Sequence, residues 1–183
     1  MPKIVAKKED WINLGFKLFS EKGIAGIVIE KMAYQLKVNK SSFYWHFKTK
    51  NEFILQLIDF WVKIETDQII YLANQEKSAL EKFKTLVRLT YKKMPNQDFI
   101  FFLKRYAQKK KNVKDIIKQI DFDRIEFVKG LLQAMGYSQE EANIKSSLFY
   151  KHLIGYHEMI RNEKQAITYS KEVKKELNQF IEY

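Results

Sequence analysis

Cysteine is absent from this chain of 183 residues, and proline and glycine are scarce, at two and six residues. The absence of cysteine excludes disulfides, a thiolate nucleophile and zinc held by cysteine. Few prolines and glycines leave few points at which a helix must stop, and many of the remaining residues are lysine, glutamate, leucine, isoleucine or glutamine. No alternating strand pattern continues for more than a few residues. The sequence therefore predicts an all-α fold.

Long hydrophobic runs are also missing. The longest apolar stretches contain only a few residues, whereas a membrane-spanning helix needs about 20. The first eleven residues, MPKIVAKKEDW, are interrupted by charges and do not resemble a signal peptide. We therefore expect a cytoplasmic protein with no membrane partner. Apolar residues still make up 46% of the chain, which is enough for a sizeable core.

Acidic residues are fewer than basic residues. The chain has 33 lysines and arginines against 22 acidic residues, a formal net charge of +11. Such a charge favours a polyanionic partner, of which nucleic acid is the first candidate. The alternative explanation is that the lysines only solvate the surfaces of the helices. The first 50 residues carry ten lysines against four acids, so positive charge is densest there. This distribution predicts a DNA-binding domain over residues 1–50 and a larger body over residues 51–183.

Helical periodicity and capping signals divide the chain into about nine helices. Asn39, Thr49 and Ser138 are the expected N-caps, and Gly23 and Gly136 are the expected stops. The fourth helix begins at Lys50 and is expected to connect the N-terminal domain to the body. The helices are expected at residues 8–22, 28–36, 40–47, 50–72, 79–93, 97–108, 112–135, 139–162 and 168–181.

Residues 29–50, IEKMAYQLKVNKSSFYWHFKTK, indicate two short helices around a tight turn, a helix-turn-helix motif over residues 28–47. Five consecutive bulky residues at 43–47 cannot all face one side of a helix. Those expected to pack inward are Met32, Ala33, Leu36, Val38, Phe43 and Phe47, which leaves Lys40, Ser41, Ser42, Tyr44, Trp45 and His46 for the exposed face and its edges. The DNA major groove admits one such helix.

The side chains of the second short helix suit this groove. Lys40 can reach a guanine edge or a phosphate, and the two serines allow close approach. Tyr44 and His46 can donate hydrogen bonds to phosphates, which position a protein without reading sequence. Lys50 adds a cation at the start of the next helix, where backbone N–H groups already favour an anion.

Residues 36–50, LKVNKSSFYWHFKTK, together with the upstream Leu18-Phe19 and Gly23, resemble the DNA-binding head of the TetR family of bacterial transcriptional regulators. The resemblance covers about the first 60 residues. It implies that Lys40, Ser41, Ser42 and Trp45 face bases or sugars, that Tyr44, His46 and Lys50 hold phosphates, and that Val28 and Ile29 touch the DNA backbone with Glu30 near base edges.

The sequence departs from the family pattern at several positions. Lys37 replaces the turn glycine, so the turn is either not left-handed or strained. Ser41 replaces a second glycine, and Leu14 and Gly15 stand where the family favours alanines. Glu30 is acidic where a polyanion is expected to bind. These departures leave the operator sequence open.

The body is rich in aromatic residues, which form either an ordinary core or the lining of an apolar cavity. The resemblance implies a small effector, which we expect to be lipophilic. The candidate lining residues are Phe60, Trp61, Phe83, Tyr91, Phe102, Tyr106, Phe127 and Phe149.

The last two helices each carry a broad apolar side. By resemblance they would form a four-helix bundle between two subunits, so that a homodimer presents two heads to a palindromic operator in double-stranded DNA. The expected interface residues are Ala142, Leu148, Phe149, His152, Leu153, Tyr156 and Ile160 on one helix, and Val173, Leu177, Phe180 and Ile181 on the other.

No grouping of residues indicates catalysis, a cofactor or a metal. His152 and His157 are five residues apart, which places them about 140° apart around a helix, unsuited to a shared ion. We therefore expect a transcriptional regulator and not an enzyme, most simply a repressor released from its operator by the effector. A DNA-binding regulator without an effector is one alternative, and a basic protein with nonspecific DNA affinity is another.

Overall fold

The structure is a computed structural model that describes residues 6–92, 98–160 and 171–183. All regular elements in these residues are helical, which confirms the all-α prediction. The α-helices are α1 (Lys8–Lys22), α2 (Ile29–Gln35), α3 (Ser41–His46), α4 (Lys50–Val62), α5 (Gln68–Asn74), α6 (Ala79–Thr90), α7 (Phe99–Ala107), α8 (Lys111–Ala134), α9 (Gln139–Met159) and α10 (Lys171–Leu177).

The expected helix boundaries agree closely with these elements. The helix expected at residues 50–72 is present as α4 and α5, joined by a π-helical turn at Lys63–Asp67. Counted as one helix, they give the expected nine within the described residues. The expected helix ends at residues 93, 97, 162 and 168 lie outside the described residues. Where the chain is described, no helix is both long and apolar enough to cross a bilayer.

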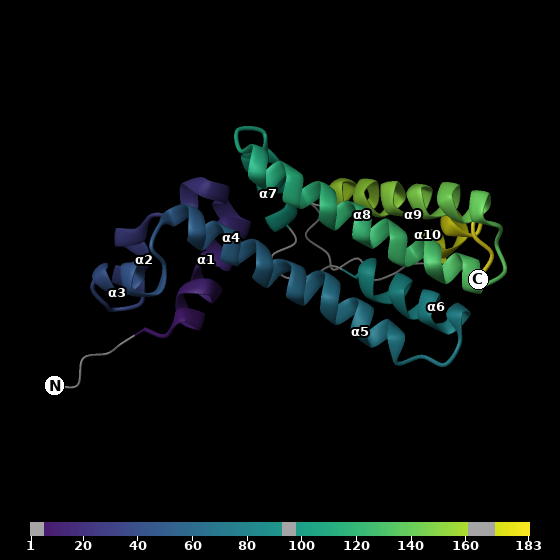
Figure 1. Cartoon of the computed structure of the whole chain (residues 1–183), viewed down its shortest axis with the longest axis horizontal. Coiled ribbons are helices and arrows are strands. Elements are labelled where there is room, and N and C mark those ends of the chain that lie inside the picture. The colour runs from purple at the N-terminus through teal and green to yellow at the C-terminus, as the bar shows by residue number, and fades with distance from the viewer. Residues whose placement is uncertain (1–5, 93–97, 161–170) are drawn as a thin grey trace. The chain divides into compact units, whose positions relative to one another are not determined.

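The chain divides into two compact units, which we call the first unit (Met1–Lys63 and Pro95–Ile117) and the second unit (Ile64–Met94 and Lys118–Tyr183). The first unit contains more than the 50 N-terminal residues expected for the DNA-binding domain. α4 belongs to it because Gly15 of α1 leaves room for the Phe53 ring and the Leu57 side chain. α7 also packs against α1 (Figure 1).

The first unit is built around aromatic rings. The Phe43 ring of α3 lies 5.3 Å from the Trp11 ring of α1 and 5.1 Å from the Phe53 ring of α4, measured between centroids. Phe47 lies 4.8 Å from Phe53 in the same cluster, and all four residues are fully buried. These contacts fix α3 on α1 and α4 from one side only, so its opposite side is left to solvent.

Local capping signals explain most of the helix boundaries. Thr49 accepts a hydrogen bond from the Glu52 N–H and Ser138 accepts one from the Glu141 N–H, which confirms both expected caps. The cap expected from the Asn39 side chain is wrong, because no side-chain hydrogen bond caps α3 and only the Asn39 carbonyl accepts, from the Ser42 N–H. Gly23 ends α1 with φ +61°.

The turn between α2 and α3 is left-handed at Lys37, where φ is +57°. The Val38 N–H donates to the Ala33 carbonyl across this residue, the hydrogen bond that closes many helices whose last position is a glycine. Of the two possibilities that the sequence left open, the strained turn is the one observed. A side chain in this region costs about 1 kcal/mol.

Replacing Lys37 with glycine should therefore stabilise the first unit. We expect Lys37→Gly to raise the free energy of unfolding by up to about 1 kcal/mol, a gain reduced by the greater freedom of glycine in the unfolded chain. Urea unfolding followed by circular dichroism would measure the change. Lys37→Ala removes the same charge without relieving the backbone, so a gain shared by both variants would contradict a backbone origin.

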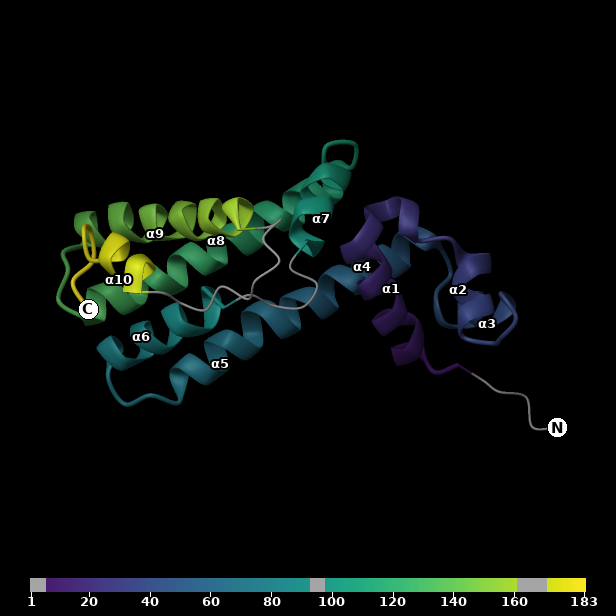
Figure 2. The same ribbon diagram turned by 180° about the vertical axis from the view of Figure 1, so that it is seen from behind.

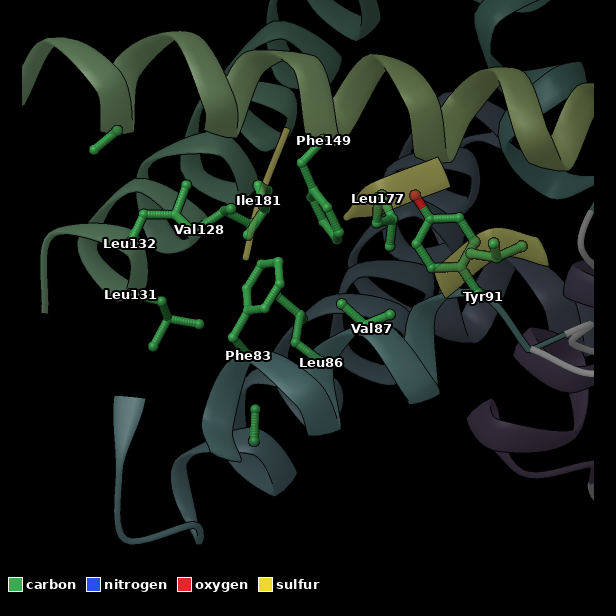
Figure 3. Packing of buried hydrophobic residues seen from close by; sticks show 13 residues of the cluster. Phe83, Leu86, Val87, Tyr91, Val128, Leu131, Leu132, Phe149, Leu177 and Ile181 are labelled. Carbon is green, nitrogen blue, oxygen red and sulfur yellow. The ribbon is translucent and has the colours of Figure 1, made fainter. Parts of the chain in front are cut away.

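The second unit has its own apolar core. α8 and α9 run side by side in it, with α10 beside them (Figures 1 and 2). Phe83 of α6 and Phe149 of α9 face each other with ring centroids 5.5 Å apart (Figure 3). The buried members of this core are Ala73, Phe83, Leu86, Val87, Tyr91, Val128, Leu131, Leu132, Ala142, Phe149, Val173, Leu177 and Ile181.

This core includes much of the surface that we expected to form a dimer interface. Six of the expected interface residues are buried within the subunit itself: Ile160, and five members of this core, namely Ala142, Phe149, Val173, Leu177 and Ile181. These residues are buried because α10 packs its apolar side onto the core of its own chain. The apolar side chains that α9 leaves exposed are Ile144, Leu148 and Met159, and with Gly155 they lie on one face.

Candidate nucleic-acid interface

The exposed face of α3 carries four of the side chains predicted to meet DNA. Lys40, Ser41 and Tyr44 are exposed, and Trp45 retains 79% of its accessible surface. A tryptophan left this open is uncommon in a folded protein, because burial of its ring is strongly favourable. α3 therefore presents a hydroxyl, a phenol, an indole and an ammonium group on a helix narrow enough for the major groove.

Two hydrogen bonds hold α3 and the start of α4 to the rest of the first unit. The His46 Nε2–H donates to the Ala6 carbonyl at 2.8 Å, so this ring holds the segment that precedes α1. The Lys50 ammonium donates to the Ile27 carbonyl at 2.6 Å, and partial burial lowers its pKa. His46 Nε2 is therefore already used within the protein, whereas two protons of Lys50 remain for a phosphate.

Two of the predicted contact residues point away from the exposed face. The Ile29 side chain is buried in the first unit, so only its backbone can meet DNA. The Ser42 hydroxyl oxygen is enclosed by protein and has no hydrogen-bond partner among the described residues. In this structure the Ser42 hydroxyl is therefore not part of the exposed face of α3.

α2 contributes a second exposed edge beside α3. Val28 is half-buried at the start of α2, and Glu30 is exposed two residues after it. The Glu30 carboxylate lies 3.8 Å from the Lys40 ammonium group. Tyr34 of α2 is also exposed, and the sequence analysis missed it. Its position follows from periodicity, since Met32 and Ala33 point inward and leave Tyr34 outside.

These features match a known family over the same residues. Residues 12–57 match the family described as bacterial regulatory proteins, tetR family. The match begins in α1 and ends in α4, so it spans the buried aromatic cluster and the exposed face of α3.

Over these residues, about a quarter of its length, the chain is similar to the TetR family.

One curated relative agrees with this match. YerO of Bacillus subtilis (strain 168), described as an uncharacterized HTH-type transcriptional regulator, is 30% identical over 63 residues. Those residues are 34% of this chain and 22% of YerO, so the match spans about a fifth of the relative's length. The similarity to YerO thus covers about a third of this chain.

Solved structures of TetR-like fold resemble nearly the whole chain. A transcriptional regulator from Saccharomonospora viridis in complex with choline has a TM-score of 0.79, with 16% identity, 96% of this chain and 95% of that chain covered. A TerR/AcrR-family regulator from Aquifex aeolicus VF5 has a TM-score of 0.68, with 20% identity and coverage of 94% and 95%. AibR in complex with isovaleryl coenzyme A and operator DNA has a TM-score of 0.71, with 9% identity and coverage of 94% and 96%. These TM-scores show a shared fold, and at such low identities the likeness shows the fold alone.

The eight rings proposed to line an effector pocket fall into two groups. The first unit holds Phe60, Trp61, Phe102 and Tyr106, and the second unit holds Phe83, Tyr91, Phe127 and Phe149. Trp61 stacks on Phe99 inside the first unit, with ring centroids 5.7 Å apart. In the second unit, the Phe149 ring contacts the rings of Phe83 and Tyr91.

The second unit contains polar side chains that the sequence analysis did not connect. The Tyr91 hydroxyl lies 2.7 Å from Nδ1 of His152, whose Nε2 lies 3.1 Å from the Glu176 carboxylate. A neutral imidazole that donates to the carboxylate and accepts from the phenol satisfies both contacts. These residues come from α6, α9 and α10, which explains why spacing along one helix gave no sign of them.

A second set of polar side chains lies around the π-helical turn. Nε and Nη2 of Arg124 donate to the Thr66 hydroxyl oxygen at 3.0 and 2.6 Å. The Tyr150 hydroxyl donates to the Asp121 carboxylate at 2.6 Å, and burial raises the pKa of this phenol. Thr66 lies in the π-helical turn, and such turns often occur at functional sites.

His157 should make the stability of the second unit depend on pH. Its Nε2–H donates to the Thr90 carbonyl at 2.7 Å, and burial lowers its pKa. As the pH falls through about 6.5, the unfolded chain takes up a proton before the folded chain does. We therefore expect the free energy of unfolding to include the full contribution of His157 above this pH. The contribution should decrease as the pH falls from there to the lower pKa of the folded state. Urea unfolding of wild type and His157→Gln across this interval would measure it, and parallel curves would contradict it.

Proposed function

We propose that the protein is a homodimeric transcriptional repressor that binds a palindromic DNA operator and releases it when a small molecule binds. The observation that carries the proposal is the exposed face of α3, where Lys40, Tyr44 and Trp45 are open to solvent above a buried aromatic cluster. Folding alone does not account for an indole and a phenol held in solvent on a basic surface. An α-helix placed in a major groove would cover both.

Dimerisation is proposed through α9. Ile144, Leu148 and Met159 are exposed large apolar residues on one face, and the intervening Gly155 has open space around it. A glycine in such a face allows two helices to approach closely. A two-fold interface built on this face would pair two copies of α3 for two half-sites about one DNA turn apart.

Release by an effector is proposed from the composition of the second unit and from the relatives. The S. viridis regulator was solved with choline and AibR with isovaleryl coenzyme A. The polar groups around His152 and Arg124 lie beside an apolar core, an arrangement suited to a lipophilic molecule with one polar end. Such a ligand would favour a body conformation in which the two heads no longer match their half-sites.

Selection from a random duplex library would test the DNA-binding part of this proposal. We expect the full chain to enrich a palindromic sequence, with Tyr44→Ala and Lys50→Ala weakening binding to every duplex and Lys40→Ala relaxing the sequence preference. Equal binding to all duplexes would overturn the proposal in favour of a nonspecific basic protein.

A thermal-shift screen would test the effector part separately. Lipophilic cations and acyl compounds are the probes, and a compound that raises the melting temperature should also release the selected duplex. A compound that stabilises the protein without releasing DNA would contradict this mechanism. The absence of any shift would favour a regulator whose body only dimerises or binds a protein partner.

A further inference from the structure

An ion pair joins α2 to the start of α3 on the surface proposed to meet DNA. Glu30 Oε1 and Lys40 Nζ are 3.8 Å apart, and their side chains remain 66% and 64% exposed. Ion pairs this open to solvent contribute little to stability, because water and salt screen them. The fold therefore gives no strong reason for an acidic residue at this place on a basic surface.

A carboxylate in the major groove is selective about what it meets. Phosphates repel it, and so do the acceptor atoms of base edges, which are guanine O6 and N7 and thymine O4. Only the amino groups of cytosine (N4) and adenine (N6) offer it a hydrogen-bond donor. Glu30 can therefore remain at the DNA surface without a large penalty only where such an amino group faces it.

Lys40 narrows the choice to one base pair. Its ammonium group is a donor whose commonest base partner is guanine, because O6 and N7 offer two adjacent acceptors. Wherever Lys40 lies over a guanine, the neighbouring donor on the same base pair is cytosine N4. The 3.8 Å between the Glu30 oxygen and the Lys40 nitrogen places an acceptor and a donor side by side, as the edge of this base pair requires.

We propose that Glu30 and Lys40 together read one C·G base pair in each half-site, with Glu30 accepting from cytosine N4 and Lys40 donating to guanine. This inference rests on the proposed operator binding and adds to it a fixed base pair and a reader for each base. Glu30 would attract the amino group of cytosine and would also repel bases that place an acceptor at this position. A T·A pair in the same position would set thymine O4 against the carboxylate, and the protein would reject it.

Parallel selections with wild type and Glu30→Gln test the assignment. Wild type should enrich C·G at one position of each half-site, and its replacement by T·A should weaken binding by about 10-fold. Glutamine carries both a donor and an acceptor and pairs with adenine, so Glu30→Gln should shift this position towards adenine. Lys40→Ala should weaken the preference for guanine at the same position.

Glu21→Gln is the matched control, because it removes one negative charge from an exposed position of α1 outside the predicted contacts. Both glutamine variants should bind unrelated duplexes more tightly than wild type, but only Glu30→Gln should change the base preference. An identical motif for wild type and Glu30→Gln would overturn the base-pair assignment alone. Failure of wild type to enrich any motif would overturn the proposed operator binding itself.

Discussion

Phe43→Ala should unfold the first unit and abolish DNA binding. The Phe43 ring is fully buried beneath α3 and contacts the rings of Trp11, Phe47 and Phe53. Removing it leaves a cavity at the point where α3 is attached to α1 and α4. Buried phenylalanine-to-alanine changes cost about 3–5 kcal/mol, a large part of the stability of a typical domain. Chemical unfolding and a gel-shift titration with the selected duplex would measure the two effects.

Phe149→Ala is the matched control for this change. It deletes the same atoms from the core of the second unit, where Phe149 packs against Phe83 and Tyr91. We expect a comparable loss of stability, but the folded fraction should keep its affinity for an isolated half-site because the rings beneath α3 are intact. If Phe43→Ala still bound DNA like wild type, α3 would not depend on this cluster for its position.

Trp45→Ala should weaken specific DNA binding by about 100-fold without affecting folding. The indole is 79% exposed and makes a ring contact with His46, so its removal leaves no cavity. In the proposed complex it lies at bases or sugars, where loss of a large apolar contact should weaken each half-site by about 10-fold. In a dimer, the loss of affinity applies to both half-sites. Calorimetry would show an unchanged melting temperature, and gel shifts would show the lost affinity.

Tyr71→Ala is the control for a general effect of exposed aromatic residues. Tyr71 is exposed on α5 of the second unit, outside the predicted contacts. We expect this variant to bind DNA as wild type does. A similar loss of affinity in both variants would mean that the exposed rings act through solubility or aggregation and not through contact with DNA.

The sequence predicted the first unit more completely than the second. Residues 43–47 could be divided into inward and outward positions, because a helix of five bulky residues has only one buried side. Phe43 and Phe47 are buried and Tyr44 and Trp45 exposed, as predicted. The enclosed Ser42 hydroxyl could not be predicted, because a small side chain at the edge of a helix gives no apolar signal for either side.

The second unit could not be predicted in the same way, because its contacts join distant parts of the chain. Tyr91 meets His152 across 61 residues, and Arg124 meets Thr66 across 58. Periodicity identified the apolar sides of α9 and α10 but not what covers them. Ala142 and Leu177 were therefore assigned to a dimer interface, although they lie in the core of their own subunit.

Fluorescence quenching tests most directly whether the exposed face of α3 enters DNA. The chain has three tryptophans, of which Trp11 and Trp61 are 0% and 1% exposed and Trp45 is 79% exposed. Acrylamide should quench one component of the emission, and Trp45→Phe should remove that component. Adding the selected duplex to wild type should shield this component from acrylamide. Bound DNA that left Trp45 as accessible as in the free protein would contradict the placement of α3 in the groove.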